Sequence, residues 1–269
     1  MGRYQEHDHS EMSATLERSF VTRIRATGEV SKYPFCVRDL FNEEKRDSIL
    51  REQALQQGLL LRGEGSVAVG TLFAKRYSVL VMAVISAFSL YDTSLSIAEE
   101  DIRFELNGEG GMRYETRLAR TCMTGSEDPA ERGLEISMLR DRLQLHLEYV
   151  FQSVAVATGA SYKVMSALVA HNVQQLVMRM IDDRRIWKTE RRLAQMKVDQ
   201  SIWLDRSNDN TFAIRLQRFE HSKWQGPPFL IRRYCCLAYQ VGSGSHAHGY
   251  CNSCPKLDSE ARWQNLSQH

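Results

Sequence analysis

The chain has 269 residues and a mass of 30.9 kDa, which suits one large domain or two small ones. Hydrophobic residues make up 43%, charged residues 25% and aromatic residues 9%, ordinary globular values that exclude a disordered, collagen-like or coiled-coil chain. Lys and Arg total 35 against 33 Asp and Glu, a net charge of +2. Because dedicated nucleic-acid binders carry a strong basic excess, we expect no nucleic-acid partner.

The N-terminal residues 1–20 show no hydrophobic periodicity, and we predict that they form a mobile tail. Their polar start lacks the apolar core of a signal peptide. The apolar run over residues 78–90 is too short to cross a bilayer. We therefore expect a soluble, cytoplasmic protein without a transmembrane segment.

Two helices are predicted in the first third of the chain. Asn42 can cap the first of these, with Glu43 and Glu44 at the positive end of its dipole and Gly58 as its end. The second has an apolar face with helical spacing, made of Phe73, Tyr77, Leu80, Val81, Val84 and Phe88. Its opposite side is also apolar, so we predict a helix buried nearly all round.

The period then changes from helical to alternating. Residues 101–106 and 112–116 alternate in polarity on either side of a glycine-rich stretch, which predicts a β-hairpin. A further short strand is predicted over residues 212–219.

Helices follow the hairpin. Asp128-Pro129 predicts a helix start and Gly159 its stop, and Ser161 can cap the next helix. The charged stretch 182–192 leads into another helix near Met196. The predicted fold class is α+β: a mostly helical body, a small antiparallel sheet and a C-terminal cysteine-rich segment.

Four of the six cysteines lie within twenty residues near the C-terminus, namely Cys235, Cys236, Cys251 and Cys254. In an intracellular protein, clustered cysteines indicate metal or redox chemistry. Four thiolates can hold a zinc ion or a [2Fe–2S] cluster. Adjacent cysteines are hard to direct at one tetrahedral zinc, and a two-iron cluster offers positions on two metals, so we favour the cluster. Pro255, after the last cysteine, also recurs in iron–sulfur motifs.

The fourteen residues between the two cysteine pairs contain a Gly/Ser/His loop, residues 241–249, that lets the pairs close on one cofactor. His246 and His248 in this loop raise the alternative of a mixed His and Cys site. Four cysteines already complete a cluster, so we assign the two histidines to a solvated loop or to a hydrogen bond with a cluster sulfur.

This segment resembles the C-terminal signature of the FhuF-like ferric-siderophore reductases, a likeness that extends over residues 60–257. The matching residues are Arg232, Arg233, Cys235, Cys236, Leu237, Tyr239, Cys251, Cys254 and Pro255. The spacer between the cysteine pairs is longer than is usual in the family. The resemblance suggests a tail (1–20), a siderophore-binding domain (21–225), a [2Fe–2S]-binding segment (226–257) and a second tail (258–269).

The resemblance implies a cytoplasmic oxidoreductase that reduces a ferric siderophore, of hydroxamate type, with one electron from a [2Fe–2S] cluster and so releases ferrous iron. No catalytic residue beyond the cluster is required. The electron donor would be a ferredoxin or a flavoprotein reductase, and peripheral association with the inner membrane is compatible with this role.

Substrate contacts are predicted at Arg232, Arg233, His171, Asn172 and Trp224. Arg232 and Arg233 can face an anionic chelate or an acidic electron donor, or tune the cluster. His171 and Asn172 suit a satisfied buried pair better than a ligand contact. Trp224 can stack on a flat ligand or pack in the core.

Two functions remain as alternatives. One is a zinc module for protein contacts, and the other is an iron–sulfur redox or iron sensor. Kinship of the family with siderophore synthetases adds a third, but the chain has no phosphate-binding glycine motif, which argues against it.

Overall fold

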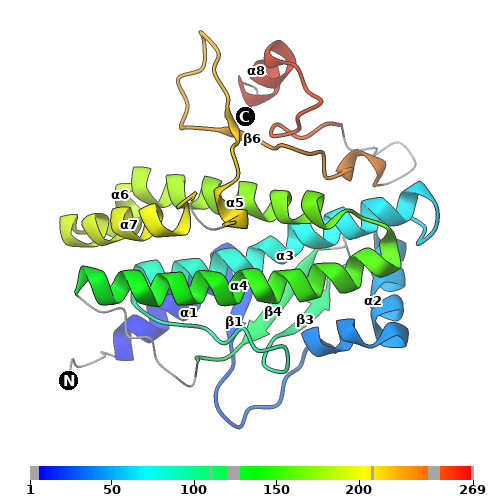
Figure 1. The fold of residues 1–269 in the computed structure, drawn as a ribbon, viewed down its shortest axis with the longest axis horizontal. Coiled ribbons are helices and arrows are strands. Elements are labelled where there is room, and N and C mark those ends of the chain that lie inside the picture. The colour runs from blue at the N-terminus through cyan, green and yellow to red at the C-terminus, as the bar shows by residue number, and fades with distance from the viewer. Residues whose placement is uncertain (1–5, 109–110, 120–127, 207–208, 242–248, 268–269) are drawn as a thin grey trace.

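The structure is a computed structural model that describes residues 6–108, 111–119, 128–206, 209–241 and 249–267. Long helices form the body, with a small sheet on one side and a C-terminal lobe on the other (Figure 1). Within the described ranges the helices are α1 (Glu6–Phe20), α2 (Glu43–Gln56), α3 (Glu64–Tyr91), α4 (Pro129–Thr158), α5 (Tyr162–Asp182), α6 (Arg184–Trp187), α7 (Glu190–Trp203) and α8 (Ser259–Ser267), with 3-10 turns η1 (Val37–Phe41), η2 (Thr211–Ala213) and η3 (Ala238–Gln240). This is the α+β architecture predicted.

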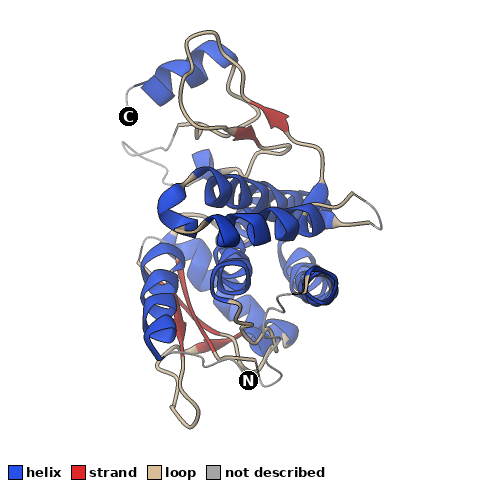
Figure 2. Ribbon diagram, turned by 90° about the vertical axis from the view of Figure 1, so that its left-hand side faces the viewer, coloured by secondary structure: helices blue, strands red, loops and turns tan. Residues whose placement is uncertain are grey.

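Helix α3 is the central helix of the body, and it contacts α1, α4, α5 and α7. Its apolar side chains are buried on most sides, as the uninterrupted hydrophobic pattern predicts. The stretch Gly65–Tyr91 is long and apolar enough to span a membrane by length and composition, and 78% of its most apolar window is buried inside the protein. In the side view of Figure 2, several helices of the body lie between the sheet and the C-terminal lobe.

The predicted helix ends are confirmed. The Asn42 side chain accepts a hydrogen bond from the Lys45 amide at 3.1 Å, and Asp128 accepts one from the Ala130 amide at 2.7 Å. Gly159 ends α4 with a φ of 69°, in the left-handed region that glycine enters at little cost. These short-range signals therefore place the long helices that carry the rest of the fold.

The main sheet has the strand order β1-β4-β3-β2. Its strands are β1 (Thr22–Ile24), β2 (Phe35–Cys36), β3 (Arg103–Leu106) and β4 (Met112–Thr116). The predicted hairpin is confirmed as β3–β4, and β2 adds antiparallel to β3. The sheet is mixed rather than purely antiparallel, because β1 pairs parallel to β4. Strands of two or three residues are too short to show an alternating pattern.

The strand predicted over residues 212–219 is mostly wrong. Thr211–Ala213 form η2, and only Gln217–Arg218 are extended, as β5. This strand pairs antiparallel with β6 (Leu230–Ile231) in a separate two-stranded sheet within the C-terminal lobe. The apolar residues that suggested alternation instead pack individually, as Phe212 does in the main core.

Both predicted tails contain helices. Residues 6–20 form α1, in which Met12, Leu16 and Phe20 are buried at a spacing of four residues. Three apolar positions in a polar segment give too weak a periodic signal to predict a helix. Residues 259–267 form α8, whose buried residue is Arg262 rather than an apolar side chain, so it carries no hydrophobic pattern. These two segments belong to the fold and are not tails.

Gly70 in α3 provides a test of the packing between α3 and the end of α4. A Cβ at this position would lie 2.6 Å from the Ala160 Cβ and closer still to the Thr158 hydroxyl oxygen. We expect Gly70→Ala to lower the free energy of unfolding by about 2 kcal/mol, because overpacking outweighs the gain in helix propensity.

The control for this prediction is Gly133→Ala in α4, where the added Cβ meets the flexible tip of Ile202 at 3.2 Å. This change should be neutral or stabilising by up to about 1 kcal/mol. Urea unfolding of both variants measures the effects, and equal changes in stability would contradict the close packing assigned to Gly70.

His146 predicts a pH dependence of stability. Burial lowers its pKa to about 4, and its Nε2 lies 2.7 Å from the Tyr77 hydroxyl. The unfolded chain binds a proton below about pH 6.5. The native state resists protonation of His146, so the stability that depends on the neutral imidazole is fully present above pH 6.5. It decreases by about 3 kcal/mol as the pH falls from 6.5 to 4.

The variant His146→Gln keeps an acceptor for the Tyr77 hydroxyl but cannot titrate. Urea unfolding at pH 7 and at pH 5 should show a smaller loss of stability in the variant than in the parent protein. Part of the slope should remain, because burial also lowers the pKa of His171. An unchanged slope would show that His146 is not buried in its neutral form.

Candidate functional site

The four clustered cysteines lie together in the C-terminal lobe, where it meets the helical body. The Sγ atoms of Cys235 and Cys254 are 3.5 Å apart. Cys236 and Cys251 interact through a hydrogen bond between their thiols. All four are free cysteines, with no disulfide among them. Each sulfur pair therefore joins one cysteine from before the intervening loop with one from after it.

A tight turn after the adjacent cysteines positions the first two sulfurs. Leu237 has a φ of 60°, in the left-handed region that a leucine rarely adopts. The turn brings the Leu237 amide to 3.4 Å from the Cys235 sulfur and lets the Ala238 amide donate to Cys236. Strained backbone of this kind is typical of sites where geometry matters more than stability.

Helices α3 and α5 hold Cys236 from below. Its side chain is fully buried and packs against Leu72 of α3 and Leu168 of α5. The Thr71 hydroxyl donates a hydrogen bond of 2.9 Å to the Cys236 carbonyl oxygen. The central helix of the fold thus fixes the backbone of the cysteine segment directly.

Gln175 of α5 anchors the chain that leads into the cysteines. Its side-chain nitrogen donates to the Pro228 carbonyl at 3.0 Å, and its oxygen accepts from the Leu230 amide at 2.9 Å. Two residues later, the Arg232 amide donates to the Ser253 carbonyl at 2.9 Å. This bond joins the strand before the first cysteine pair to the turn that carries the second.

Arg262 of α8 supports the second cysteine pair from the outside. Its guanidinium donates to the carbonyl oxygens of Asn252, Cys254 and Leu257, at 3.1, 2.8 and 2.6 Å. The side chain is buried, with 2% of its surface exposed. One buried arginine therefore satisfies two backbone carbonyls of the Cys-x-x-Cys turn and one of the residues that follow it, and so fixes the shape of this segment.

Positive charge surrounds the sulfurs. The Arg232 guanidinium contacts the Cys251 sulfur, and Lys75 of α3 lies near the same pair. The hydrogen bond from the Cys251 thiol lowers the pKa of Cys236 to about 4, with help from Lys75 and Arg232 and against the effect of burial. The same bond, together with burial, raises the pKa of Cys251. Of this pair, Cys236 is the residue whose ionised form the surrounding contacts favour.

Arg232 carries the most informative feature of the site. It is 3% exposed, and its Nε and Nη1 atoms have no hydrogen-bond partner. Burial opposes its charge, yet its pKa is raised by the electrostatic attraction of Cys236, Cys251 and Cys254 and by a hydrogen bond with Cys236. A buried guanidinium with unpaired donors is costly unless an anionic group accepts from it.

Four free cysteine sulfurs are the donor set that a [2Fe–2S] cluster requires. Two sulfurs on one tetrahedral metal lie about 3.8 Å apart for bonds of about 2.3 Å, close to the spacing of Cys235 and Cys254. Among the described residues, no three His, Cys, Asp or Glu side chains are gathered to hold a single ion. Two separate pairs suit a cluster with two thiolates on each iron, and the unpaired donors of Arg232 suit its anionic sulfur.

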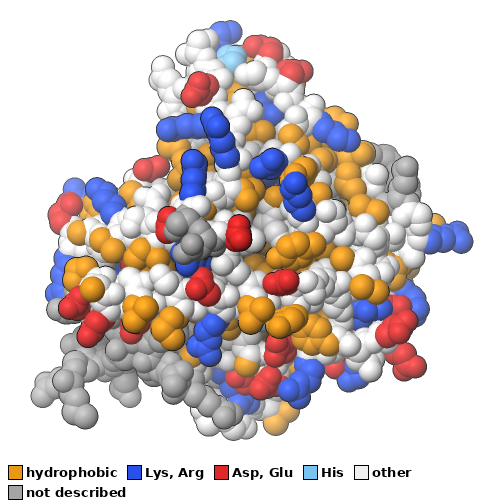
Figure 3. Space-filling view, viewed as in Figure 1, with side chains coloured by type: hydrophobic (Ala, Val, Ile, Leu, Met, Phe, Trp, Pro, Cys, Tyr) orange, Lys and Arg blue, Asp and Glu red, His pale blue; other side chains and the backbone are white. Residues whose placement is uncertain are grey.

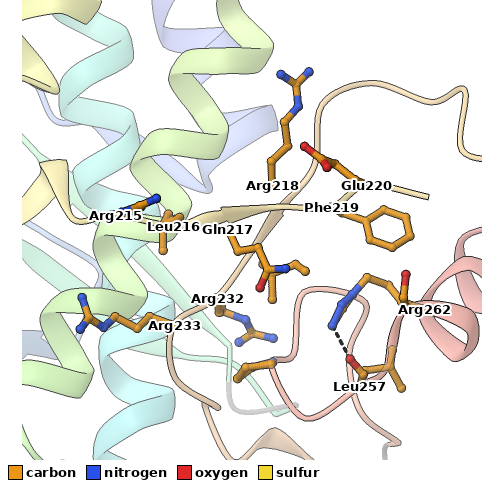
Figure 4. A pocket seen from close by; sticks show the side chains of 13 residues that line it. Arg215, Leu216, Gln217, Arg218, Phe219, Glu220, Arg232, Arg233, Leu257 and Arg262 are labelled. Carbon is orange, nitrogen blue, oxygen red and sulfur yellow. Dashed lines mark hydrogen bonds between the residues drawn. The ribbon is translucent and has the colours of Figure 1, made fainter. Parts of the chain in front are cut away.

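A cavity of about 560 Å³ opens beside the cysteine segment (Figure 4). Arg232 lies near its centre, between Arg233 on one side and Arg262 on the other. Its lining comes from strands β5 and β6, from the turn after Cys254 and from α8; the residues are Arg215, Leu216, Gln217, Arg218, Phe219, Glu220, Ile231, Arg232, Arg233, Pro255, Leu257, Ser259 and Arg262.

The structure brings two of the five predicted substrate residues to this cavity, Arg232 and Arg233. Trp224 does not line it: its indole N–H donates to the Pro227 carbonyl at 3.3 Å, and its ring packs near Phe219. His246 and His248 lie outside the described residues.

His171 and Asn172 make internal contacts and do not line the cavity. His171 Nε2 lies 2.9 Å from the Leu230 carbonyl oxygen, and Asn172 donates to the Ser78 hydroxyl at 2.6 Å. Both side chains have hydrogen-bond partners inside the protein, which confirms the sequence interpretation of a satisfied buried pair. Together with Gln175, His171 holds the chain before the cysteines on α5.

Sequence reasoning missed Gln175, Lys75 and Arg262. Gln175 lies one turn after His171 on the same helix face. Two polar residues at this spacing on a buried helix could have indicated a shared polar contact. Lys75 lies beside Arg76 in an otherwise apolar stretch, and Arg262 lies in the segment assigned to a tail. Nothing in their local sequence links these two residues to the cysteines.

No family model matches the chain, and a search of curated proteins finds no significant match. The likeness to the FhuF-like reductases therefore rests on the cysteine motif and its neighbours.

The role of Gln175 can be tested with Gln175→Met, which keeps the volume and removes both hydrogen bonds. We expect a loss of about 2 kcal/mol in the free energy of unfolding, because the Leu230 amide and the Pro228 carbonyl lose their partners. Hydrogen exchange of the amides at residues 230–232 should also become faster.

The matched control is Gln152→Met on the exposed face of α4, where the amide donates to Glu148 at 3.0 Å. This surface change should alter stability by less than about 0.5 kcal/mol. If the amides of residues 230–232 exchange as slowly in Gln175→Met as in the parent protein, α5 does not hold this strand.

Proposed function

We propose that this protein is a ferric-siderophore reductase that carries one [2Fe–2S] cluster on Cys235, Cys236, Cys251 and Cys254. The observation that carries the proposal is the buried guanidinium of Arg232, which has two unpaired donors and lies beside Cys236, Cys251 and Cys254. The resemblance of the motif to the FhuF-like family supplies the reaction class. The cavity beside the cysteines supplies a place for the substrate.

The chemistry needs one electron and no broken covalent bond. Ferric iron is a hard ion that binds hard oxygen donors very tightly, and ferrous iron has lower charge and prefers softer ligands. A [2Fe–2S] cluster with four thiolate ligands would supply single electrons at low potential. The electron comes from an external donor, a reduced ferredoxin or flavoprotein. It reduces Fe(III) to Fe(II), which then leaves the siderophore.

The protein's own residues have three tasks in this reaction. The buried Cys236 and Cys254 keep water from one side of the sulfurs. The amides of Leu237 and Ala238 and the Arg232 guanidinium place hydrogen-bond donors and positive charge around them. Such contacts stabilise added negative charge and so set the reduction potential. Gln175 and Arg262 hold both cysteine pairs in place.

The test begins with anaerobic purification and analysis of iron, sulfide and zinc. We expect a brown protein with visible bands that bleach on reduction with dithionite. The reduced protein is then mixed anaerobically with several ferric hydroxamate siderophores, and ferrous iron is trapped with a chromogenic chelator. We expect the visible bands to return as ferrous iron appears, in step with siderophore concentration.

Two buried cysteines provide matched variants. Cys254→Ser removes a proposed ligand and should abolish both the visible bands and the release of iron. Cys36→Ser alters a buried thiol that donates to the Glu99 carbonyl, far from the lobe, and should leave both unchanged.

Two other results would contradict the proposal. A colourless protein with bound zinc would indicate a structural module. A cluster that cycles without reoxidation by any ferric siderophore would indicate a redox sensor.

A further inference from the structure

The cavity beside the cysteines concentrates positive charge. Five of its thirteen lining residues are arginines, and one, Glu220, is acidic. The whole chain carries a net charge of only +2. Figure 3 shows Lys and Arg side chains gathered where the C-terminal lobe meets the helices. A net positive concavity in a nearly neutral protein is a feature that draws anions.

Three of these arginines are available to a ligand. Arg215, Arg218 and Arg233 are exposed, and among the described residues none has a carboxylate within ion-pair distance. The other two are engaged, since Arg262 binds backbone carbonyls and Arg232 contacts Cys251. The planar guanidinium matches the two oxygens of a carboxylate, so this set favours carboxylate-bearing ligands.

The size and position of the cavity suit a small molecule near the sulfurs. Its volume of about 560 Å³ falls within the range of about 300–1,000 Å³ for small-molecule sites. Arg232 lines the cavity and contacts Cys251, so one side chain separates the cavity from the cysteine pairs. A smaller apolar pocket of about 170 Å³ shares Arg233 and is lined by Tyr162, Ile214 and Tyr234, among others.

We propose that this cavity is the chelate site of the reductase and that it selects ferric chelates with net negative charge, held through free carboxylates by Arg215, Arg218 and Arg233. This inference rests on the proposed function and narrows its substrate class. A concave site of this volume fits a chelate better than the broad surface of a protein electron donor.

Binding can be measured without electron transfer by using gallium(III), which has the charge and coordination of ferric iron but is not reduced. Three gallium complexes are titrated into the cluster-loaded protein by calorimetry: an anionic citrate-based dihydroxamate that carries further carboxylates not bound to the metal, a neutral cyclic trihydroxamate and a cationic linear trihydroxamate. We expect the anionic complex to bind at least about tenfold more tightly than the other two, with an affinity that falls as salt increases.

The double variant Arg215→Gln/Arg218→Gln should weaken binding of the anionic complex by about tenfold and leave the neutral complex unchanged. Both side chains are exposed, so folding should be preserved, and thermal unfolding checks this. The control is Arg51→Gln, an exposed arginine on α2 that does not line the cavity. It should bind all three complexes like the parent protein.

Equal affinities for the three complexes, or a charge preference that survives the double variant, would overturn the inference. The inference would also be overturned if the double variant bound chelates normally but was reduced more slowly by an acidic ferredoxin. The arginines would then be a docking site for the electron donor. Reduction of ferric chelates without charge preference would leave the proposed function standing. Charge-selective gallium binding without ferric reduction would remove that function and leave the anionic chelate site.

Discussion

The burial of Arg232 against the cysteines is the interaction on which the rest of the C-terminal lobe depends. A guanidinium with 3% exposure and two unpaired donors would be strongly destabilising in an apolar setting. Here the sulfurs of both cysteine pairs provide the opposing charge. The same residue joins the lobe internally, since its amide bonds to Ser253. Charge compensation and backbone pairing therefore meet at one position.

The helical body supports this arrangement mainly with polar contacts. Thr71 of α3 and Gln175 and His171 of α5 each bond to backbone groups of the segment that carries the cysteines. The apolar contact is small, with Leu72 and Leu168 around Cys236. Hydrogen bonds to backbone specify position more narrowly than apolar packing does, because each requires a particular distance and angle. A lobe held in this way can keep its sulfurs in register without a large core of its own.

The long helices and the hairpin could be predicted because their signals are local, as in the capping by Asp128 and the apolar face of α3. The four cysteines could be grouped because they are close in the sequence. The parallel pairing of β1 with β4 joins residues about ninety positions apart and leaves no local trace. Arg262, Lys75 and the arginine cavity were missed for the same reason, since their roles depend on which distant segments the fold brings together. The arginines themselves could be seen in the sequence, but not that the fold brings them to one cavity.

The arginines of the cavity and the sulfurs beside it act on each other through charge. Positive side chains near thiolates stabilise added electrons and so raise a reduction potential, which works against giving an electron away. In the proposed reductase, an anionic chelate bound by Arg215, Arg218 and Arg233 offsets part of that positive charge. Electron release then becomes easier when substrate is present than when the cavity is empty. In the proposed reductase, an arginine-rich site next to the cysteines would thus both select the substrate and limit the loss of electrons to other acceptors, through the same electrostatic interaction.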